Sequence, residues 1–399
     1  MSPNFLELGL TLALVAAVAY GAFKLHMPSI PFLICLGLIL SPQAPLLLPV
    51  DYRLHGSFPA FILLGQLGLL CLLFTLGLEF SLGRLLKAGH RIVVSGLAYT
   101  AVHWFYGILA AWIWGWRGLA VIINGAIVTI SSSAIIAKVL VDLKRTARPE
   151  TEMILGITLF QDVFAALYLA WLASFMWSGQ ISPVSRLILS LVFLFTGILF
   201  IWGGKLLAPH LGDFLDRLGE EVFVLVTFAL LFLIAGLMGF FYSEALGALL
   251  LGMLLGETEE RERLERVMVP FRDFLGALFF FSFGLEVDPH NLVLVWPLSS
   301  MAAGFTLLLS SVTGFFLARI YGYSPQGALN TGLTLVPRGE FSLVLATFSS
   351  LLPGCSLIPP FTALYVLILS FLGPLLTRYS RSLYNVLAPY LKWPLTRGH

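Results

Sequence analysis

The sequence predicts an all-α membrane protein with thirteen transmembrane helices. Of its 399 residues, 59% are hydrophobic and only 11% are charged, whereas soluble domains carry about 25% charged residues. Apolar stretches close to the roughly 20 residues that cross a bilayer follow one another along the chain. Pro, Gly and charge clusters separate these stretches at fairly even spacing. This composition excludes a secreted soluble domain, a nucleic-acid binder and a disordered chain.

The thirteen expected spans are numbered here in chain order. They cover residues 5–23, 29–48, 58–81, 92–115, 119–141, 151–177, 185–206, 220–239, 242–256, 269–286, 291–319, 324–348 and 360–378. The first span is not expected to be a signal peptide, because it lacks a basic leader and carries Glu7. The boundary between the eighth and ninth spans is the least marked, since only Phe240 and Phe241 separate them.

The basic residues predict the orientation. Of the 23 Lys and Arg residues, 19 follow odd-numbered spans or lie in the carboxyl-terminal tail, and only Arg53, Arg117 and Arg186 lie on the opposite side. The remaining one, Arg338, falls inside a span. By the positive-inside rule, the amino terminus lies outside and the carboxyl terminus in the cytoplasm, with the protein in the inner (plasma) membrane. An even number of spans would break this partition.

Two short matches indicate an internal repeat. Residues Leu76–Glu79 end the third span as Phe283–Glu286 end the tenth, and Asn124 and Asn330 lie at similar places in the fifth and twelfth. Each match pairs spans seven apart, so the paired spans cross the membrane in opposite directions. Inverted repeats of this kind are typical of secondary transporters.

The expected domain organisation follows from this repeat. Residues 1–399 form a single polytopic membrane domain with two inverted repeats of six helices, at about 1–177 and 220–378. The helix 185–206 links them, and residues 379–399 form a cytoplasmic tail. No GxGxxG motif occurs, so no nucleotide-binding domain is expected. The three cysteines lie in apolar runs, which argues against a disulfide or metal framework.

The fifth and twelfth spans are expected to be discontinuous helices that cross. In the fifth, hydroxyl groups at mid-span compete for the backbone hydrogen bonds of the helix. These hydroxyls belong to Thr129, Ser131, Ser132 and Ser133. In the twelfth, Pro337 removes a backbone donor and Gly339 loosens the chain. Paired interruptions point to a binding site near the membrane midplane. The alternative is a serine-lined packing contact and a proline kink.

Asp162 is the strongest candidate for the ion-binding group. It lies near the middle of the sixth span, where a carboxylate costs at least about 2.5 kcal/mol unless it faces water or a partner. Such a carboxyl could hold either a proton or a small cation, but not both, which is the chemistry of an antiporter. The alternative is a fixed Asp162–Arg338 ion pair that only holds helices together.

The neighbouring polar residues complete the expected site for a monovalent cation at Asp162. Gln161 could offer a carbonyl oxygen to the ion, offer an amide donor to a broken helix, or simply pack. Arg338 could neutralise the negative end of a half-helix or occupy the site when no cation is bound. Glu340 is expected to pair with Arg338 or Lys138. The hydroxyls of the fifth span and freed carbonyls supply the oxygens that Na⁺ or K⁺ requires.

Four segments resemble the Kef-type branch of the monovalent cation:proton antiporter superfamily, which has the fold of bacterial sodium/proton antiporters. They are Leu73–Phe80, Ser131–Ile135, Leu159–Asp162 and Gly339–Ser342. The resemblance covers essentially the whole chain. It implies that Asp162 is the alternating ion carrier, with Gln161 where charge-moving relatives have a second acid. It also implies one-for-one, electroneutral exchange, in which helices 4–6 and 11–13 move against a dimerising scaffold.

The predicted function is therefore secondary active transport, in which K⁺ or Na⁺ is exchanged for H⁺ by alternating access. No enzyme constellation and no cofactor are expected. The expected partners are the cation, H⁺, the lipid bilayer and a second copy in a homodimer, with or without a regulatory cytoplasmic subunit, and no nucleic acid. A sodium-coupled symporter of an organic anion and a gated K⁺ efflux system are the alternatives. Arg338 stands where glutathione-gated potassium members have Gly, which argues against a channel-like efflux mode.

Overall fold

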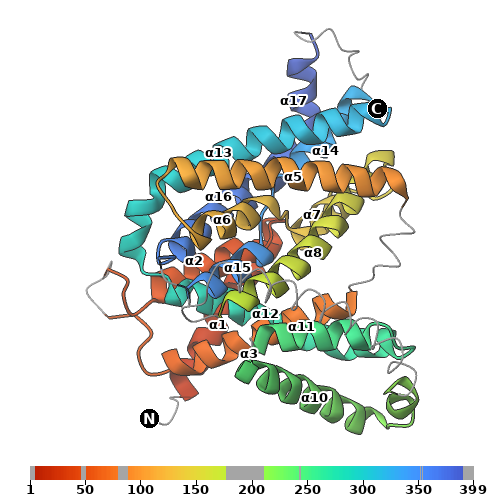
Figure 1. Ribbon diagram of the computed structural model, residues 1–399. Helices are drawn as coiled ribbons and strands as arrows, with labels where there is room; N and C mark the ends of the chain where they lie inside the picture. Colours follow the sequence, from red (N-terminus) through yellow and green to blue (C-terminus); the bar gives the residue numbers. More distant parts are fainter. Residues whose placement is uncertain are drawn as a thin grey trace. The chain divides into compact units, whose positions relative to one another are not determined.

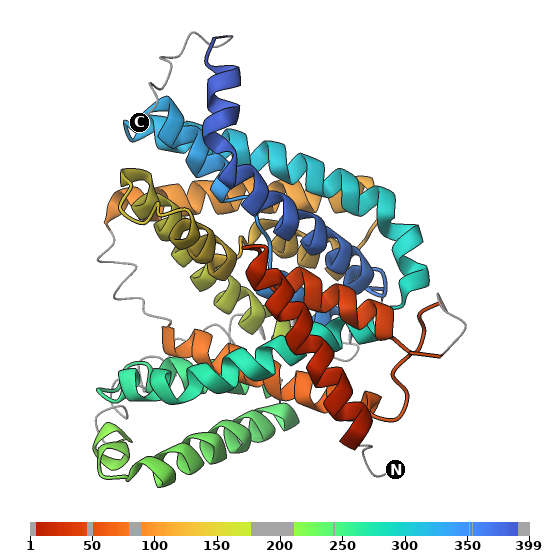
Figure 2. The same ribbon diagram turned by 180° about the vertical axis from the view of Figure 1, so that it is seen from behind.

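The computed structural model describes residues 5–45, 51–79, 89–176, 211–241, 244–350, 352 and 354–389. The expected helix 185–206 lies outside these residues. The described chain is helical (Figures 1 and 2). It divides into two compact units, and each unit combines segments that are far apart in the sequence. Unit 1 consists of Met1–Glu7, His55–Arg84 and Val163–Phe283, and unit 2 of Leu8–Leu54, Leu85–Asp162 and Gly284–His399.

Unit 2 contains both helices that the sequence predicts to be interrupted. Its helices are α1 (Phe5–Lys24, from Leu8), α2 (Ile30–Leu40), α5 (His90–Ile113), α6 (Leu119–Thr129), α7 (Ser133–Asp142), α8 (Pro149–Met176, as far as Asp162), α13 (Pro289–Ile320), α14 (Pro325–Thr334), α15 (Glu340–Ser349), α16 (Ile358–Arg378) and α17 (Ser380–Leu387). Helix α13 packs against α5, α14 and α16, and α16 also packs against α2 (Figure 2).

The core of unit 2 joins both halves of the sequence. One buried apolar cluster consists of Tyr99, Ile136, Leu140, Met153, Ile154, Ile157, Ala318, Ala328 and Leu335. These side chains come from α5, α7, α8, α13, α14 and the segment that follows α14. The cluster therefore fixes the half-helices α7 and α14 against the longer helices around them.

Unit 1 consists of α3 (Phe58–Glu79), α10 (Glu220–Phe241), α11 (Glu244–Leu255), most of α12 (Arg261–Glu286) and the second part of α8. Helices α3 and α11 approach closely because Gly77 faces the backbone of Leu249, and Gly252 faces that of Phe74. Small residues at such contacts let membrane helices pack backbone against backbone.

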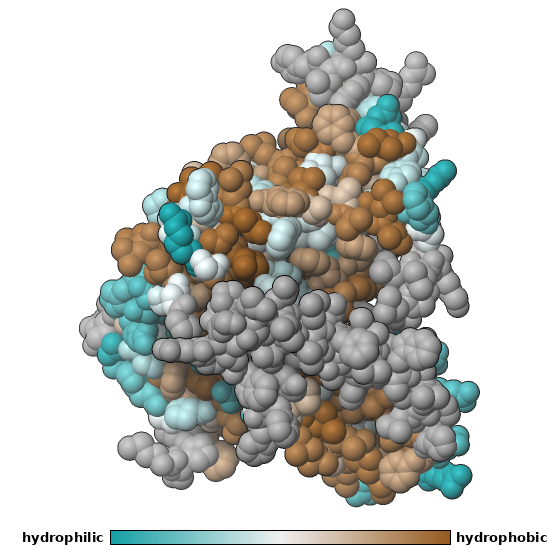
Figure 3. All heavy atoms as spheres, viewed as in Figure 1, coloured by the Kyte–Doolittle hydropathy of each residue, from teal (hydrophilic) through white to brown (hydrophobic). Residues whose placement is uncertain are grey.

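Nine helices of the described chain are long and apolar enough to cross a membrane. Large apolar side chains lie exposed along the outer faces of α5 and α13, among them Leu97 and Phe105 on α5 and Phe305 and Phe316 on α13 (Figure 3). A soluble protein would bury such side chains, whereas lipid solvates them. These faces and spans establish a multi-pass membrane protein. The count of thirteen helices stays a prediction.

Two helix boundaries and the expected tail differ from the sequence prediction. Helix α12 begins at Arg261 rather than at residue 269, and Arg261 forms an i,i+4 salt bridge of 2.7 Å with Glu265 in its first turns. Helix α2 ends at Leu40, well before residue 48. The expected tail contains α17, which packs against α14 through the buried Tyr384. Hydropathy alone places a boundary where the apolar run ends, so it misses charged turns and short amphipathic helices.

Candidate ion-binding site

Both expected interruptions are present in unit 2. Helix α6 ends at Thr129 and α7 begins at Ser133, while α14 ends at Thr334 and α15 begins at Glu340. The two connecting segments are hydrogen-bonded to each other, because the Ser132 amide donates to the Pro337 carbonyl at 2.9 Å. Four helix ends therefore meet at one buried point, which we call the helix crossing.

Arg338 joins the two carboxyl-terminal helix ends at the crossing. Its side chain is completely buried. Its Nε donates to the Val128 carbonyl at 2.8 Å, at the end of α6. Its Nη1 donates to the carbonyls of Leu335 (2.9 Å) and Val336 (3.0 Å), just after α14, and to Ser131 Oγ at 3.0 Å. A cation held against two carboxyl-terminal ends opposes the partial negative charge of both helices.

Glu340 and Ser132 occupy the two amino-terminal helix ends. Ser132 caps α7 by accepting from the Ile135 amide at 3.3 Å. The Ser132 hydroxyl also donates to Glu340 Oε2 at 2.8 Å, and Glu340 is the first residue of α15. A carboxylate suits this place because helix amino termini carry partial positive charge. The sequence predicts Arg338 or Lys138 as the partner of Glu340. In the structure, Lys138 Nζ donates to the Met27 carbonyl at 3.0 Å, and Arg338 donates to the groups described above.

Gln161 ties α8 to the interruption between α6 and α7. Its Nε2 donates to the Thr129 carbonyl at 2.7 Å, and its Oε1 accepts from the Ser131 amide at 3.2 Å. Both ends of the amide are thus used on the two sides of the break. Asp162 is the next residue of α8 and is half-buried. The carboxyl group is therefore carried on the helix that Gln161 fastens to the crossing.

Most hydroxyls of the expected ligand set take part in hydrogen bonds within the crossing. Thr129 Oγ1 donates to the Gly125 carbonyl at 2.7 Å, and Ser131 Oγ donates to the Leu335 carbonyl at 3.0 Å. Ser133 differs, because it is half-buried and its hydroxyl makes no hydrogen bond to any described residue. The whole Ser133 hydroxyl is therefore available to a ligand, and Thr129 Oγ1, which only donates, also keeps its lone pairs.

A layer of buried polar side chains lies behind the crossing and was not found from the sequence. Tyr99 donates its hydroxyl to the Leu335 carbonyl at 3.2 Å, and Tyr365 donates to the Val128 carbonyl at 3.4 Å. His103 Nδ1 lies 2.8 Å from the Tyr99 carbonyl, which can only accept, so Nδ1 carries the proton. Nε2 lies 3.1 Å from Ser310 Oγ, from which it accepts when the ring is neutral. The i,i+4 spacing of Tyr99 and His103 was the available sequence signal.

The two asparagines that the sequence pairs in the predicted repeat have different surroundings. Asn124 donates to the Gly107 carbonyl at 2.7 Å. Asn330 accepts from Arg145 at 2.6 Å and donates to Glu150 Oε1 at 3.1 Å, which connects α14 to the turn between α7 and α8. Arg145 is buried in this turn, and loss of water lowers the pKa of its guanidinium from the ordinary value. In the sequence analysis, Arg145 was counted only among the basic residues that predict the membrane orientation.

The site combines two interrupted helices, charged side chains that oppose the partial charges of the helix ends, and a neighbouring helix that carries a carboxyl group. These features define an ion-transporting membrane protein of the discontinuous-helix type. Residues 10–378 match the family described as sodium/hydrogen exchanger, transmembrane. The chain belongs to this family of cation/proton antiporters, which are transporters and not enzymes.

The chain is similar to curated relatives over nearly its whole length. It is 44% identical over 389 residues to the K(+)/H(+) antiporter subunit KhtU of Bacillus subtilis, covering 97% of this chain and 96% of the relative. It is 28% identical over 387 residues to the ammonium/H(+) antiporter subunit AmhT of Alkalihalophilus pseudofirmus, covering 96% and 95%.

The fold is also similar to a solved antiporter structure. The sodium proton antiporter MjNhaP1 from Methanocaldococcus jannaschii, determined at pH 8, matches with a TM-score of 0.61 at 21% sequence identity. The match covers 94% of this chain and 95% of that chain. At this identity the comparison establishes the fold alone.

Proposed function

We propose that this chain exchanges a monovalent cation for H⁺ by alternating access, and that Asp162 binds the proton and the cation in turn. The observation that carries the proposal is the bonding of Gln161 across the α6–α7 break, because it fixes the helix that bears Asp162 to the crossing. Asp162 is the single acid of the proposed site, and its neighbour Gln161 is neutral. One carboxyl can exchange one proton for one cation, which favours one-for-one, electroneutral exchange.

The remaining site residues divide into three proposed roles. Ser133 and freed backbone carbonyls supply further oxygens to the cation, since the Ser133 hydroxyl is available. Gln161, Ser131 and Ser132 position the break, because hydrogen bonds within the crossing use both donor and acceptor groups of their side chains. Thr129 belongs with the ligands, because its hydroxyl only donates and keeps its oxygen lone pairs for the cation. Two further residues compensate the charges of the helix ends: Arg338 and Glu340.

K⁺ is the proposed cation, with Na⁺ as the competitor. The support is the 44% identity to KhtU, which is named for K⁺, whereas MjNhaP1 is named for sodium at 21% identity. AmhT is named for ammonium, a cation close to K⁺ in size, which also favours the larger cations over Na⁺ and Li⁺.

The test uses the purified full chain in proteoliposomes that contain an internal pH dye. Adding K⁺ or Rb⁺ should dissipate an imposed proton gradient faster than adding Na⁺ or Li⁺, and an imposed membrane potential should leave the rate unchanged. Asp162→Asn should abolish the exchange. Asp142→Asn, which neutralises an exposed carboxylate at the end of α7, is the matched control and should exchange normally.

Normal exchange by Asp162→Asn would contradict the role of that residue. Uptake of an organic anion without proton flux would favour the symporter instead.

The topology and assembly are proposed on separate grounds. The Lys and Arg distribution supports an external amino terminus and a cytoplasmic carboxyl terminus in the plasma membrane. The two interruptions, seven expected spans apart, support inverted repeats at about 1–177 and 220–378. KhtU and AmhT are both named as subunits, which supports a regulatory partner in addition to the homodimer. Accessibility of tags at the two termini and cross-linking in membranes test these points.

A further inference from the structure

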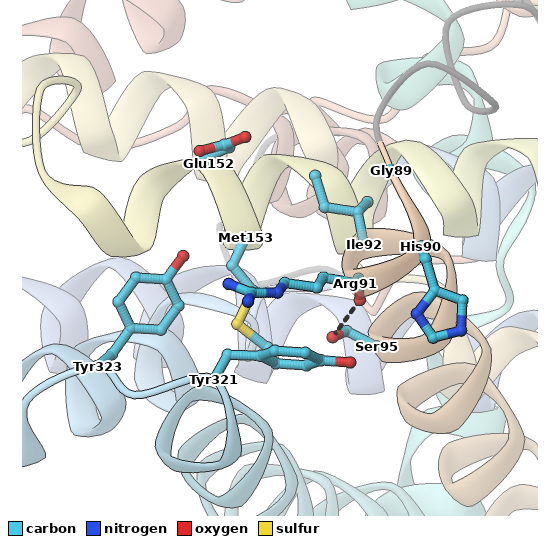
Figure 4. Close-up of a pocket in the computed structure, with 9 residues that line it drawn as sticks. All are labelled: Gly89, His90, Arg91, Ile92, Ser95, Glu152, Met153, Tyr321 and Tyr323. Atoms are coloured by element: carbon cyan, nitrogen blue, oxygen red, sulfur yellow. Dashed lines mark hydrogen bonds between the residues drawn. The ribbon is translucent and has the colours of Figure 1, made fainter.

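A cavity of about 380 Å³ lies within unit 2 where three spans end (Figure 4). Its walls come from the start of α5 at His90, the first turn of α8 after Pro149 and the segment that follows α13 at Ile320. Since spans begin and end at the membrane–water boundary, the cavity lies at the depth of lipid headgroups. It shares no lining residue with the helix crossing.

Two opposite charges line this cavity without pairing. Arg91 on α5 and Glu152 on α8 are both exposed. The Arg91 guanidinium lies over the Tyr321 ring, 5.9 Å from its centroid. Neither its guanidinium nor the Glu152 carboxylate forms an ion pair or hydrogen bond with any residue that the structure describes. Figure 4 shows them on different walls of the cavity. Both charges are therefore available to a ligand.

Arg91 and Glu152 both influence the phenol of Tyr323, which also lines the cavity. Burial raises the pKa of the Tyr323 phenol, the carboxylates of Glu152 and Glu150 raise it further, and Arg91 lowers it. The Tyr323 phenol thus feels both charged groups. Aromatic faces also attract ammonium groups, so a cationic part of a ligand would be favoured beside Glu152 and the rings.

The polar cavity continues into an apolar surface on the membrane side. Val94 lies three residues beyond Arg91 on α5, and Leu155 lies three residues beyond Glu152 on α8, so each shares a helix face with its charged neighbour. Both side chains are exposed. A ligand with charged groups in the cavity could therefore lay a hydrocarbon chain along this surface.

We propose that this cavity binds the headgroup of a zwitterionic phospholipid, with the phosphate on Arg91 and the ammonium on Glu152. A purely anionic headgroup would satisfy only Arg91 and leave its negative charge facing Glu152. A simple cation would satisfy only Glu152. A phosphoethanolamine headgroup carries both charges, and its acyl chains would follow Val94 and Leu155. Such a lipid would connect α5, α8 and α13 of unit 2.

The test measures lipid binding to the detergent-purified full chain by native mass spectrometry. Phosphatidylethanolamine should bind about fivefold more tightly than phosphatidylglycerol, which has the phosphate but no ammonium. Glu152→Gln should abolish that preference by weakening phosphatidylethanolamine alone. Arg91→Gln should weaken both lipids. The double variant Arg91→Glu, Glu152→Arg, which keeps both charges in exchanged places, should recover part of the preference.

Matched controls are Arg217→Gln and Glu221→Gln, which neutralise exposed charges beside the start of α10 and should leave the preference intact. Equal binding of the two lipids by the unaltered chain, an unchanged preference in Glu152→Gln, or unchanged affinities for both lipids in Arg91→Gln would overturn the proposal. Equally tight binding of free O-phosphoethanolamine would also overturn it by identifying a soluble ligand. Lipid binding is measured without transport, so this result is independent of the role of Asp162.

Discussion

Replacing Arg338 with Gln should destabilise unit 2 strongly. The guanidinium is fully buried and donates to three carbonyls and one hydroxyl at 2.8–3.0 Å. A glutamine is shorter and neutral, so it leaves buried carbonyls without donors and two helix carboxyl termini without a cation. Breaking a buried charge network of this kind costs about 3–5 kcal/mol.

This cost should appear in the melting temperature of the detergent-purified protein. A loss of this size lowers the melting temperature by roughly 10 °C in a domain of about 200 residues. Arg117→Gln is the control, because the Arg117 guanidinium also donates to carbonyls, those of Trp112 and Trp116, but is exposed. A melting temperature of Arg338→Gln within about 2 °C of the unaltered protein would refute the assignment of Arg338 to the helix ends.

Three further substitutions test other parts of the structure. Gln161→Leu removes both hydrogen bonds across the α6–α7 break and should cut the exchange rate more than tenfold while the protein still folds. Asp288 caps α13 by accepting from the His290 amide at 2.9 Å, which lowers the pKa of its carboxyl. Asp288→Ala should therefore cost at most about 1 kcal/mol at pH 7. Because the folded-state pKa of Asp288 lies below its unfolded value of about 3.9, the contribution is fully present above about pH 3.9 and is lost only as the pH falls through the lowered folded-state pKa. The difference between Asp288→Ala and the unaltered protein should therefore shrink only in melts at pH values below that lowered pKa. Gly77→Ala should lower the melting temperature, because an added methyl would meet the backbone of α11, whereas Gly236→Ala has open space and should not.

The position of the helix breaks could be predicted from the sequence because their causes are local. Pro337 and Gly339 disrupt α-helical hydrogen bonding wherever they occur, and consecutive serines compete for the same backbone groups. The structure contains both interruptions within a few residues of these side chains. The family could be inferred for the same reason, since its motifs are short and contiguous.

The partners of the buried polar groups could not be predicted, because they depend on tertiary placement. Arg145 and Asn330 are 185 residues apart, yet their side chains are hydrogen-bonded at 2.6 Å. Nothing in the sequence distinguishes Arg145 from the basic residues around it that remain exposed. The sequence left three roles open for Gln161, and only the structure shows that its two amide atoms bond to opposite sides of the break.

The crossing balances its own helix-end charges, which bears on the alternative of a fixed Asp162–Arg338 ion pair. Arg338 opposes two carboxyl-terminal ends through Nε and Nη1, and Glu340 lies at an amino-terminal end. None of the Arg338 hydrogen bonds involves the Asp162 carboxyl, so we expect them to persist when Asp162 takes up a proton. Asp162→Asn should therefore abolish exchange with little change in melting temperature, whereas Arg338→Gln should lower the melting temperature. If Asp162→Asn instead destabilises the protein as much as Arg338→Gln does, the two residues act as a structural pair, and the ion carrier must be sought elsewhere.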